Sequence, residues 1–284
     1  MAILLTATAA RATRFKSLHI PGTPLLLANI YDGHSARVLA SWHNPQCKAL
    51  ATASWALAHI SGKADEALTL PDQLSLLPPI AAVAAEFDLP LTADIQDGYA
   101  AAGDHNTLSK VIKQFITEFG IVGVNLEDSF HDRVGGEETV MNEDEAVKRV
   151  ETVLRAAREL GVEDFVVNAR ADSFLKGAKL EESIRRAKRY LRAGATTAFI
   201  FWPPKEEMLV EDVQRVIDEL GGMVNVGCRL GRGITPADLA RMGAARVSVG
   251  PQLYLATAKV REAAGGEEAI AEVLREKAGE VFGV

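Results

Sequence analysis

Eight short, almost continuously apolar runs recur along the chain, and longer amphipathic segments separate them. The runs lie at 24–30, 49–54, 90–95, 122–128, 165–170, 197–202, 223–227 and 246–250. Continuous rather than alternating hydrophobicity is typical of strands that are buried on both faces. Eight such strands with intervening helices, within about 250 residues of the 284-residue chain, predict an α/β fold of the (β/α)8 TIM-barrel type.

The segments between the runs have helical periodicity. They lie at 72–87, 105–119, 143–160, 180–193, 206–220 and 236–242, and "EEAIAEVLREKAGEVF" adds an extra helix at the C-terminus. A doubly wound open sheet is the competing architecture, but it usually has a glycine-rich first turn, and "IYDGHSAR" contains only Gly33. We therefore expect a single barrel domain over 1–284, with a lead-in at 1–20 and the extra helix within 264–284.

Composition excludes several classes of function. The net charge is −7 and no long Lys/Arg cluster occurs, which argues against nucleic acid as a partner. No apolar stretch approaches the roughly 20 residues that span a bilayer, so we expect no membrane segment. The N-terminus lacks a secretory pattern and predicts a cytoplasmic protein. Its basic residues, with no acid before Asp32, leave a mitochondrial transit peptide open.

Charged residues gather where apolar runs end. The third, fourth and fifth runs finish on Asp94 and Asp97, Glu127 and Asp128, and Arg170 and Asp172. A single acid in such a place is most often a helix cap. A barrel, however, puts its chemistry at the C-terminal ends of its strands, and a set of charges from three successive strands favours convergence on one mouth.

Converging carboxylates need a cation between them. Oxygen ligands in this pattern suit Mg²⁺, which keeps several of its waters and binds one or two carboxylates directly. Such an ion can bind a 2-oxo acid and stabilise the enolate formed when the adjoining bond breaks. Arg170 could then hold a second anionic group of the substrate by a bidentate contact.

Six blocks of the sequence resemble, in order, those of the isocitrate lyase/phosphoenolpyruvate mutase superfamily, and most closely its phosphonomutase-like branch. They are "LLLANIYDGHSARVLA", "TADIQDGYA", "GVNLEDS", "NARADSF", "RAKRYLRAGA" and "GAARVSVG", and the match runs from about Phe15 to Gly250. The resemblance implies a (β/α)8 barrel that uses Mg²⁺, or Mn²⁺ in its place. It also implies cleavage or rearrangement of a C–C or P–C bond beside a 2-oxo acid. It further implies a homo-oligomer, a dimer or tetramer whose C-terminal helix is exchanged between subunits.

The resemblance also implies roles for individual residues. The metal positions are Asp94, Gln96 and Glu127, and the turn Thr52, Ala53 and Ser54 matches the one that holds the carboxylate and carbonyl of the substrate. Arg170 matches the substrate-binding arginine, and Asp65 matches an aspartate close to the substrate. His131, in the loop 129–141 that we interpret as a lid, is a further catalytic candidate.

At three places the sequence departs from the family pattern, and these departures limit the activities that we expect. The second metal position is the neutral Gln96, which predicts weaker binding of Mg²⁺. The loop 129–141 has no "KxCGH" segment, so isocitrate and methylisocitrate lyase activities are not expected. The sixth run ends in "FIFWPP" where related lyases place a glutamate, so Phe201 and Trp202 either form an apolar wall of the site or pack beneath the lid.

We therefore expect a Mg²⁺-dependent lyase, hydrolase or phosphonomutase that acts on a small 2-oxo or 2-hydroxy acid. The main alternative is a barrel that has lost catalysis and serves as a binding or assembly protein. A third possibility is a phosphate-binding sugar isomerase or aldolase barrel that uses Arg229.

Overall fold

The barrel predicted from the apolar runs is present in the computed structural model, which describes residues 2–131, 139–203, 207–263 and 266–283. The eight strands are β1 (Leu25–Leu27), β2 (Leu50–Ala51), β3 (Leu91–Asp94), β4 (Gly123–Glu127), β7 (Val166–Ala171), β8 (Thr197–Ile200), β9 (Val224–Gly227) and β10 (Arg246–Ser248). They pair in parallel in the order β1-β10-β9-β8-β7-β4-β3-β2. A parallel bridge between Ile30 and Thr52, just beyond β1 and β2, joins the two outer strands and completes the ring.

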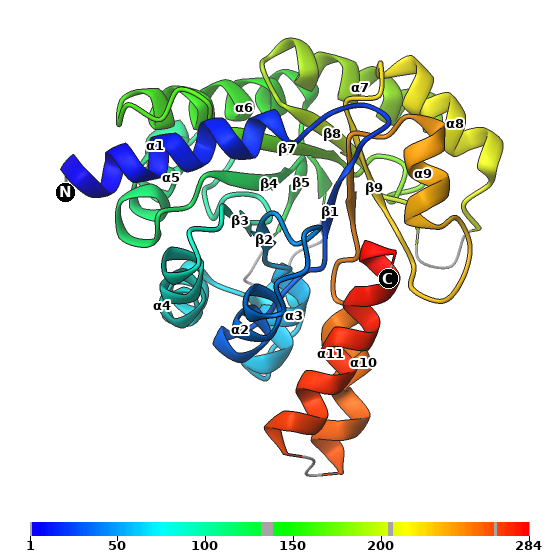
Figure 1. Ribbon diagram of the computed structural model, residues 1–284. Coiled ribbons are helices and arrows are strands. Elements are labelled where there is room, and N and C mark those ends of the chain that lie inside the picture. The colour runs from blue at the N-terminus through cyan, green and yellow to red at the C-terminus, as the bar shows by residue number, and fades with distance from the viewer. Residues whose placement is uncertain (1, 132–138, 204–206, 264–265, 284) are drawn as a thin grey trace.

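Helices surround the strands (Figure 1). They are α2 (Gly33–Ser41), α3 (Ser54–Ile60), α4 (Leu70–Glu86), α5 (His105–Phe119), α6 (Glu143–Arg158), α7 (Leu180–Arg192), α8 (Val210–Glu219) and α9 (Pro236–Met242), with the 3₁₀ helix η1 (Asp65–Ala67). The predicted segments agree closely, except that the fifth begins at Val210 rather than at 206, because Leu209 has an extended backbone. The short α2 and α3 were not predicted.

The lead-in at 1–20 forms a helix, α1 (Ala2–Ser17), that closes the floor of the barrel. Phe15 and Ala12 are fully buried. A Cβ atom at Gly123, the first residue of β4, would lie only 3.0 Å from the Phe15 ring and 2.8 Å from the Val166 carbonyl oxygen. Glycine at this position therefore lets the aromatic ring approach the strands at the end opposite the mouth.

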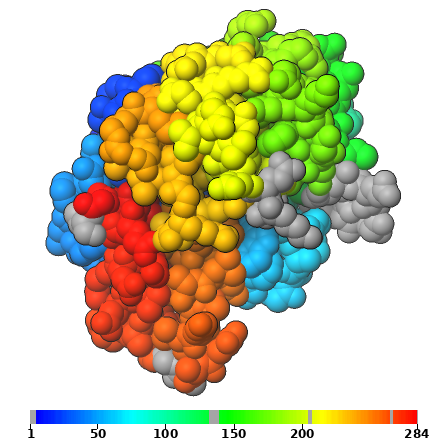
Figure 2. Space-filling view, turned by 90° about the vertical axis from the view of Figure 1, so that its right-hand side faces the viewer, coloured from blue at the N-terminus to red at the C-terminus, as the bar shows by residue number. Residues whose placement is uncertain are grey.

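The chain ends in a pair of helices, α10 (Gln252–Glu262) and α11 (Glu267–Phe282). They protrude from the end of the molecule opposite α1 (Figure 1), and the space-filling view shows the orange and red pair extending below the barrel (Figure 2). In this chain α11 packs on α10 and α2, with Leu274 and Val281 fully buried. The extra C-terminal helix is thus confirmed, and its exchange between subunits stays a prediction.

The barrel interior beneath the mouth is unusually polar. Arg246 is fully buried and donates from Nη2 to Asn125 Oδ1 at 2.9 Å, and Asn168 Nδ2 donates to the same oxygen at 2.9 Å. Thr197 donates in turn to Asn168 Oδ1 at 2.7 Å. Since successive side chains alternate between the two faces of a strand, Glu127 and Arg170 project from the same face as Asn125 and Asn168, one layer nearer the mouth.

A short antiparallel hairpin, β5 (Ser129–Phe130) and β6 (Thr139–Val140), follows β4. Most of the loop interpreted as a lid, 132–138, lies outside the described residues. Within the described part of the chain, the helices are too short or too polar to cross a bilayer.

Candidate active site

Asp94 ends β3 and is held by residues from two other elements. Its backbone N–H donates to Thr52 Oγ1 at 3.0 Å, and the Ser54 N–H donates to its Oδ2 at 3.0 Å. Gln73 of α4 donates from Nε2 to its carbonyl oxygen at 2.7 Å. The other carboxylate oxygen, Oδ1, is buried and has no hydrogen-bond partner among the described residues. Asp94 therefore presents one anionic oxygen that is free to bind a ligand.

Glu127, at the end of β4, is enclosed by two basic side chains. Arg170 Nη1 donates to its Oε1 at 2.6 Å, and His131 Nε2 lies 2.8 Å from its Oε2. Burial raises the pKa of Glu127, while Arg170 and His131 act to lower it. Because both oxygens already have partners, Glu127 could contact a metal ion only through water or by exchanging a partner.

Arg170 is fixed on three sides. Its Nε donates to Asp172 Oδ1 at 2.5 Å, Nη1 donates to Glu127, and its Cζ lies 4.2 Å from the centroid of the Phe201 ring. Burial lowers the pKa of the guanidinium, but Asp172 and Glu127 more than offset this and raise it overall. The group is therefore a permanent cation with a set orientation, and its Nη2, for which the described residues provide no hydrogen-bond partner, remains for a ligand.

Asp65 reaches the same mouth from η1. Gln96 Nε2 donates to Asp65 Oδ1 at 2.9 Å and to the Asp65 carbonyl oxygen at 2.8 Å, and the Ser54 side chain hydrogen-bonds the Asp65 carboxylate. Burial, followed by the charge of Asp94, raises the pKa of Asp65 to about 6. Asp94 also acts on the pKa of Glu127, so these three carboxylates belong to one electrostatic cluster.

The predicted site residues therefore come together at one end of the barrel. Asp94, Gln96, Glu127, Arg170, Asp65, Ser54 and His131 are linked directly or through one neighbour. Thr52 and Ala53 lie on the same turn and are buried, and the Thr52 hydroxyl accepts a hydrogen bond from Asp94 rather than facing open solvent.

The second acidic residue after β3, Asp97, and the second one after β4, Asp128, have structural roles. Asp97 accepts hydrogen bonds from the backbone N–H groups of Tyr99 and His131, at 3.0 and 3.1 Å. Asp128 accepts from the Tyr190 hydroxyl at 2.6 Å and from Arg186 at 3.2 Å. These buried contacts hold the loops that follow β3 and β4. They leave Asp94 and Glu127 as the carboxylates that face the mouth.

Sequence reasoning missed the residues that support the loop after β3. Gln73 is fully buried, accepts a hydrogen bond from the Tyr99 hydroxyl at 2.5 Å and holds the Asp94 carbonyl. Arg149 of α6 is also fully buried and donates to the carbonyl oxygens of Asp97, Ala100 and Ala101. No local signal marks either residue, because each belongs to an ordinary helical segment.

The donor set fits a hydrated divalent cation better than a caged one. In the part of the chain that the structure describes, no three His, Cys, Asp or Glu side chains are arranged to hold a metal ion by themselves. A single buried carboxylate oxygen on Asp94, with Glu127 and the Gln96 amide nearby, suits an ion that keeps most of its waters.

The two aromatic residues after β8 have different surroundings. The Trp202 ring packs edge-on against Phe174, with centroids 5.5 Å apart, and is buried. Phe201 is half-buried, lies against Arg170 and meets Phe199 edge-on at 5.6 Å. Packing thus accounts for Trp202, whereas Phe201 forms part of the wall beside Arg170.

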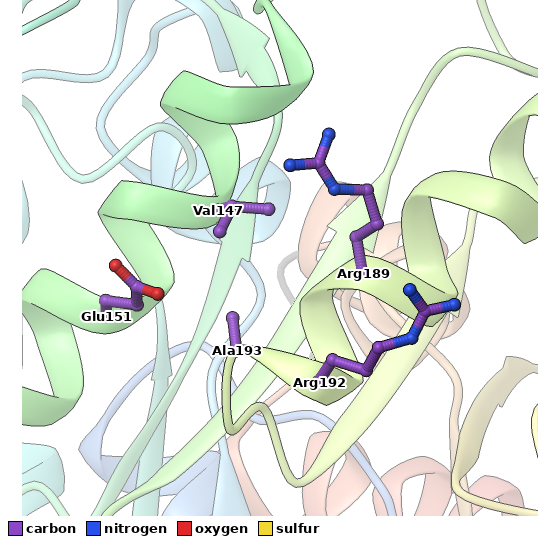
Figure 3. A pocket seen from close by; sticks show the side chains of 5 residues that line it. All are labelled: Val147, Glu151, Arg189, Arg192 and Ala193. Carbon is purple, nitrogen blue, oxygen red and sulfur yellow. The ribbon is translucent and has the colours of Figure 1, made fainter.

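A separate hollow of about 200 Å³ lies on the outside of the barrel (Figure 3). It is lined by Val147 and Glu151 of α6, Arg189 and Arg192 of α7, and Ala193. Arg189 is already paired with Asp144 at 2.6 Å. The hollow is open to solvent and lies between two outer helices rather than at the carboxyl ends of the strands, so the mouth is the better candidate for an active site.

Comparisons with known proteins show the family to which the chain belongs. The family model described as "Phosphoenolpyruvate phosphomutase" matches residues 15–267. A crystal structure from Burkholderia cenocepacia J2315, provisionally described as a phosphonomutase, is 34% identical. It covers 90% of this chain and 97% of its own, with a TM-score of 0.76.

Two curated relatives are more distant. An uncharacterized protein of Mycobacterium tuberculosis (strain CDC 1551 / Oshkosh) is 28% identical over 89% of this chain and 90% of its own length. The chloroplastic carboxyvinyl-carboxyphosphonate phosphorylmutase of Arabidopsis thaliana is 28% identical over 73% of this chain and 60% of its own length.

Proposed function

Because this chain belongs to the phosphoenolpyruvate phosphomutase family, we propose that it is a Mg²⁺-dependent enzyme acting on a small 2-oxo or 2-hydroxy acid. The reaction is cleavage or rearrangement of a C–C or P–C bond next to the 2-oxo group, as in a lyase, hydrolase or phosphonomutase. One observation carries the proposal: the unpartnered buried oxygen of Asp94 lies in the same electrostatic cluster as Glu127 and the fixed cation Arg170.

In this proposal Asp94 would hold Mg²⁺, or Mn²⁺, through Oδ1. Glu127 would contact the waters of the ion, since its two oxygens already have Arg170 and His131 as partners. When bound, the ion supplies positive charge against which the 2-oxo oxygen can accumulate negative charge as the adjoining bond breaks.

The remaining site residues bind and orient the acid. Ser54 and its neighbours Thr52 and Ala53 form the turn that receives the carboxylate end, and Ser54 also contacts both Asp94 and Asp65. Arg170 offers Nη2 to the distal anionic group, because Nε and Nη1 are bonded to Asp172 and Glu127. A guanidinium that is held in advance loses little entropy on binding, which favours a single orientation of the substrate.

Proton transfer is assigned to oxygen and nitrogen groups rather than to a thiol. Cys228 is buried and its Sγ donates to the Ile234 carbonyl oxygen at 3.4 Å, and burial raises the pKa of both Cys228 and Cys47 to about 11. The candidates are Asp65 and the Glu127–His131 pair. This supports the exclusion of isocitrate and methylisocitrate lyase activity, which the missing "KxCGH" segment first suggested.

The direct test is a panel of 2-oxo and 2-hydroxy diacids, together with phosphonopyruvate, assayed for release of pyruvate or another 2-oxo acid with Mg²⁺. Wild type should turn over at least one compound, and Asp94→Asn and Glu127→Gln should each reduce the rate by two orders of magnitude or more. Asp164→Asn, on the far face where it bonds Thr13 and Lys16, is the matched control and should retain full activity.

A wild-type protein that releases no product from any compound, and whose melting temperature does not respond to Mg²⁺ with oxalate, would instead support the non-catalytic barrel. Activity that survives Glu127→Gln but is lost in Arg229→Ala would support a phosphate-binding barrel.

We also propose that the enzyme is a homo-oligomer in which α11 is exchanged between subunits. The helix protrudes with α10 from the barrel, and Leu255 on α10 is exposed although it is large and apolar. Light scattering after size exclusion should give a dimer or tetramer. A chain ending at residue 263 should lose that assembly, and a wild-type monomer at micromolar concentration would contradict it.

A further inference from the structure

We propose that Gln96 is a positioning residue whose side-chain amide holds Asp65 in the active site, a task that a carboxylate at this position could not perform. The inference rests on the proposed function, in which Asp65 faces the substrate. Gln96 occupies the second metal position of the family pattern. In this inference its role is to position Asp65, not to bind the metal ion weakly.

The direction of the amide follows from its partners. Gln96 Nε2 lies 2.9 Å from Asp65 Oδ1 and 2.8 Å from the Asp65 carbonyl oxygen. Both of these atoms are acceptors, so the NH₂ end must face Asp65 and the amide oxygen must point elsewhere. A glutamate in the same place has no donor to offer and would set two carboxylates against each other.

The backbone at Gln96 is fixed in a conformation that serves this contact. Its φ is +51°, in the left-handed region that non-glycine residues seldom adopt, and its side chain is fully buried. Its carbonyl oxygen accepts a hydrogen bond from the Glu127 N–H at 2.8 Å. Gln96 thus connects β4, through its backbone, to Asp65, through its side chain.

The Asp65 segment depends on this contact. Asp65 belongs to the three-residue η1, in which every residue is at least partly exposed, and Gln96 binds both its backbone and its carboxylate. Loss of the amide donors should therefore loosen Asp65 while Asp94, which is held by Thr52, Ser54 and Gln73, keeps its place. A substitution at Gln96 should affect turnover more than the binding of Mg²⁺.

A double-mutant cycle tests the pair without any substrate. Gln96→Glu should lower the melting temperature of the metal-free protein by about 5 °C or more, since like charges would meet in a poorly solvated place. Asp65→Asn reverses donor and acceptor, so the double variant Gln96→Glu/Asp65→Asn should recover at least about half of that loss. Gln96→Glu combined with the remote Asp164→Asn should show no recovery.

Gln96→Met, which keeps the length but removes the donors, separates positioning from metal binding. Its Mg²⁺-dependent rise in melting temperature should match that of wild type, while kcat falls at least about tenfold. Gln96→Asn has an amide donor on a shorter side chain that does not reach Asp65, so its kcat should be almost as low as that of Gln96→Met. If Gln96→Glu alone does not fold, refolding of the double variant still supports the contact, and its failure to refold overturns it.

Additive effects of Gln96→Glu and Asp65→Asn on the melting temperature, or tighter Mg²⁺ binding by an undestabilised Gln96→Glu, would overturn the inference. These measurements do not need turnover, so they remain decisive even if the substrate panel fails and the proposed function with it.

Discussion

Two acidic residues near the same strand exit can have unrelated tasks. For Glu127 and Asp128 the alternation of side chains along the chain separates them, whereas Asp97 lies beyond β3, after the turn at Gln96. Asp94 and Glu127 face the mouth, whereas Asp97 and Asp128 are buried among backbone N–H groups, Tyr190 and Arg186. The position of the mouth-facing residues could be predicted from the ends of the apolar runs. Their partners could not, because Gln73 and Arg149 come from helices distant in sequence.

Arg170 offers a sharp test at the scale of one residue. Arg170→Lys keeps the charge but cannot donate to Asp172 and Glu127 at once, nor present a planar group to Phe201. We expect kcat/KM to fall on the order of 100-fold, mostly through KM for substrates with a distal anion. Steady-state kinetics on the diacids identified by the panel would measure it, with Arg229→Lys as control. An equal fall in kcat/KM in Arg170→Lys and Arg229→Lys would show that Arg170 has no special role in substrate binding.

His19 makes stability depend on pH. Burial, aided by Arg246, lowers the pKa of His19 from 6.5 to about 3. Because the unfolded chain binds a proton at His19 more readily than the folded one does, the stability that this neutral histidine supports is present above pH 6.5 and is lost as pH falls from 6.5 towards 3. The slope approaches about 1.4 kcal/mol per pH unit.

His19→Gln should flatten the decline, as urea unfolding at pH 7, 6 and 5 would reveal. His43→Asn, at an exposed site, should leave the pH dependence as it is in wild type. A decline of the same steepness in His19→Gln would show that other groups cause it.

At the scale of elements, continuous apolar runs identified the eight strands. The predicted helix 143–160 begins where expected, and the side chain of Asn142 caps it by accepting a hydrogen bond from the Asp144 N–H. The short α2 and α3 were missed, although α9, which is as short as α3, was predicted. The helix α1 was missed because "AILLTATAARATRF" has no clear apolar face, and its importance arises from one contact at the barrel floor.

Phe15 tests that contact. Phe15→Ala removes a fully buried ring from the floor of the barrel and should lower the free energy of unfolding by about 3–5 kcal/mol. Phe15→Leu, which retains much of the volume, should cost clearly less. Urea denaturation at fixed pH provides both values. If alanine were as well tolerated as leucine, α1 would be an appendage rather than part of the core.

At the scale of the whole molecule, the fold could be predicted because one pattern repeats eight times. The sequential order of the strands around the ring follows from the predicted barrel. The bridge between Ile30 and Thr52 and the polar interior around Arg246 could not be predicted, since they depend on contacts between side chains and strands distant in sequence. The same holds for the site: the residue types were visible, but the engagement of Glu127 by both Arg170 and His131 appears only in three dimensions.

Metal binding should be visible as stabilisation of the entire barrel. With Mg²⁺ and oxalate together at about 100 times their dissociation constants, mass action adds about 2.7 kcal/mol. The melting temperature should then rise by about 5–10 °C, and EDTA should reverse it. Asp94→Asn should abolish the shift, because it alters a buried carboxylate oxygen at the mouth that has no hydrogen-bond partner among the described residues. Sodium oxalate without Mg²⁺, and MgCl₂ without oxalate, separate the effect of the metal from that of the anion.

The number of paired residues between neighbouring strands differs around the barrel. β4 and β7 share five residue pairs, whereas β1 and β2, within the described sheet, meet only through the bridge from Ile30 to Thr52. Thermal fluctuations should therefore part the barrel at this seam first, and the seam borders the turn that carries Ser54. The side of the mouth next to β1 and β2, which would receive the substrate carboxylate, should therefore move more than the side formed by β3, β4 and β7, which carries the charged residues.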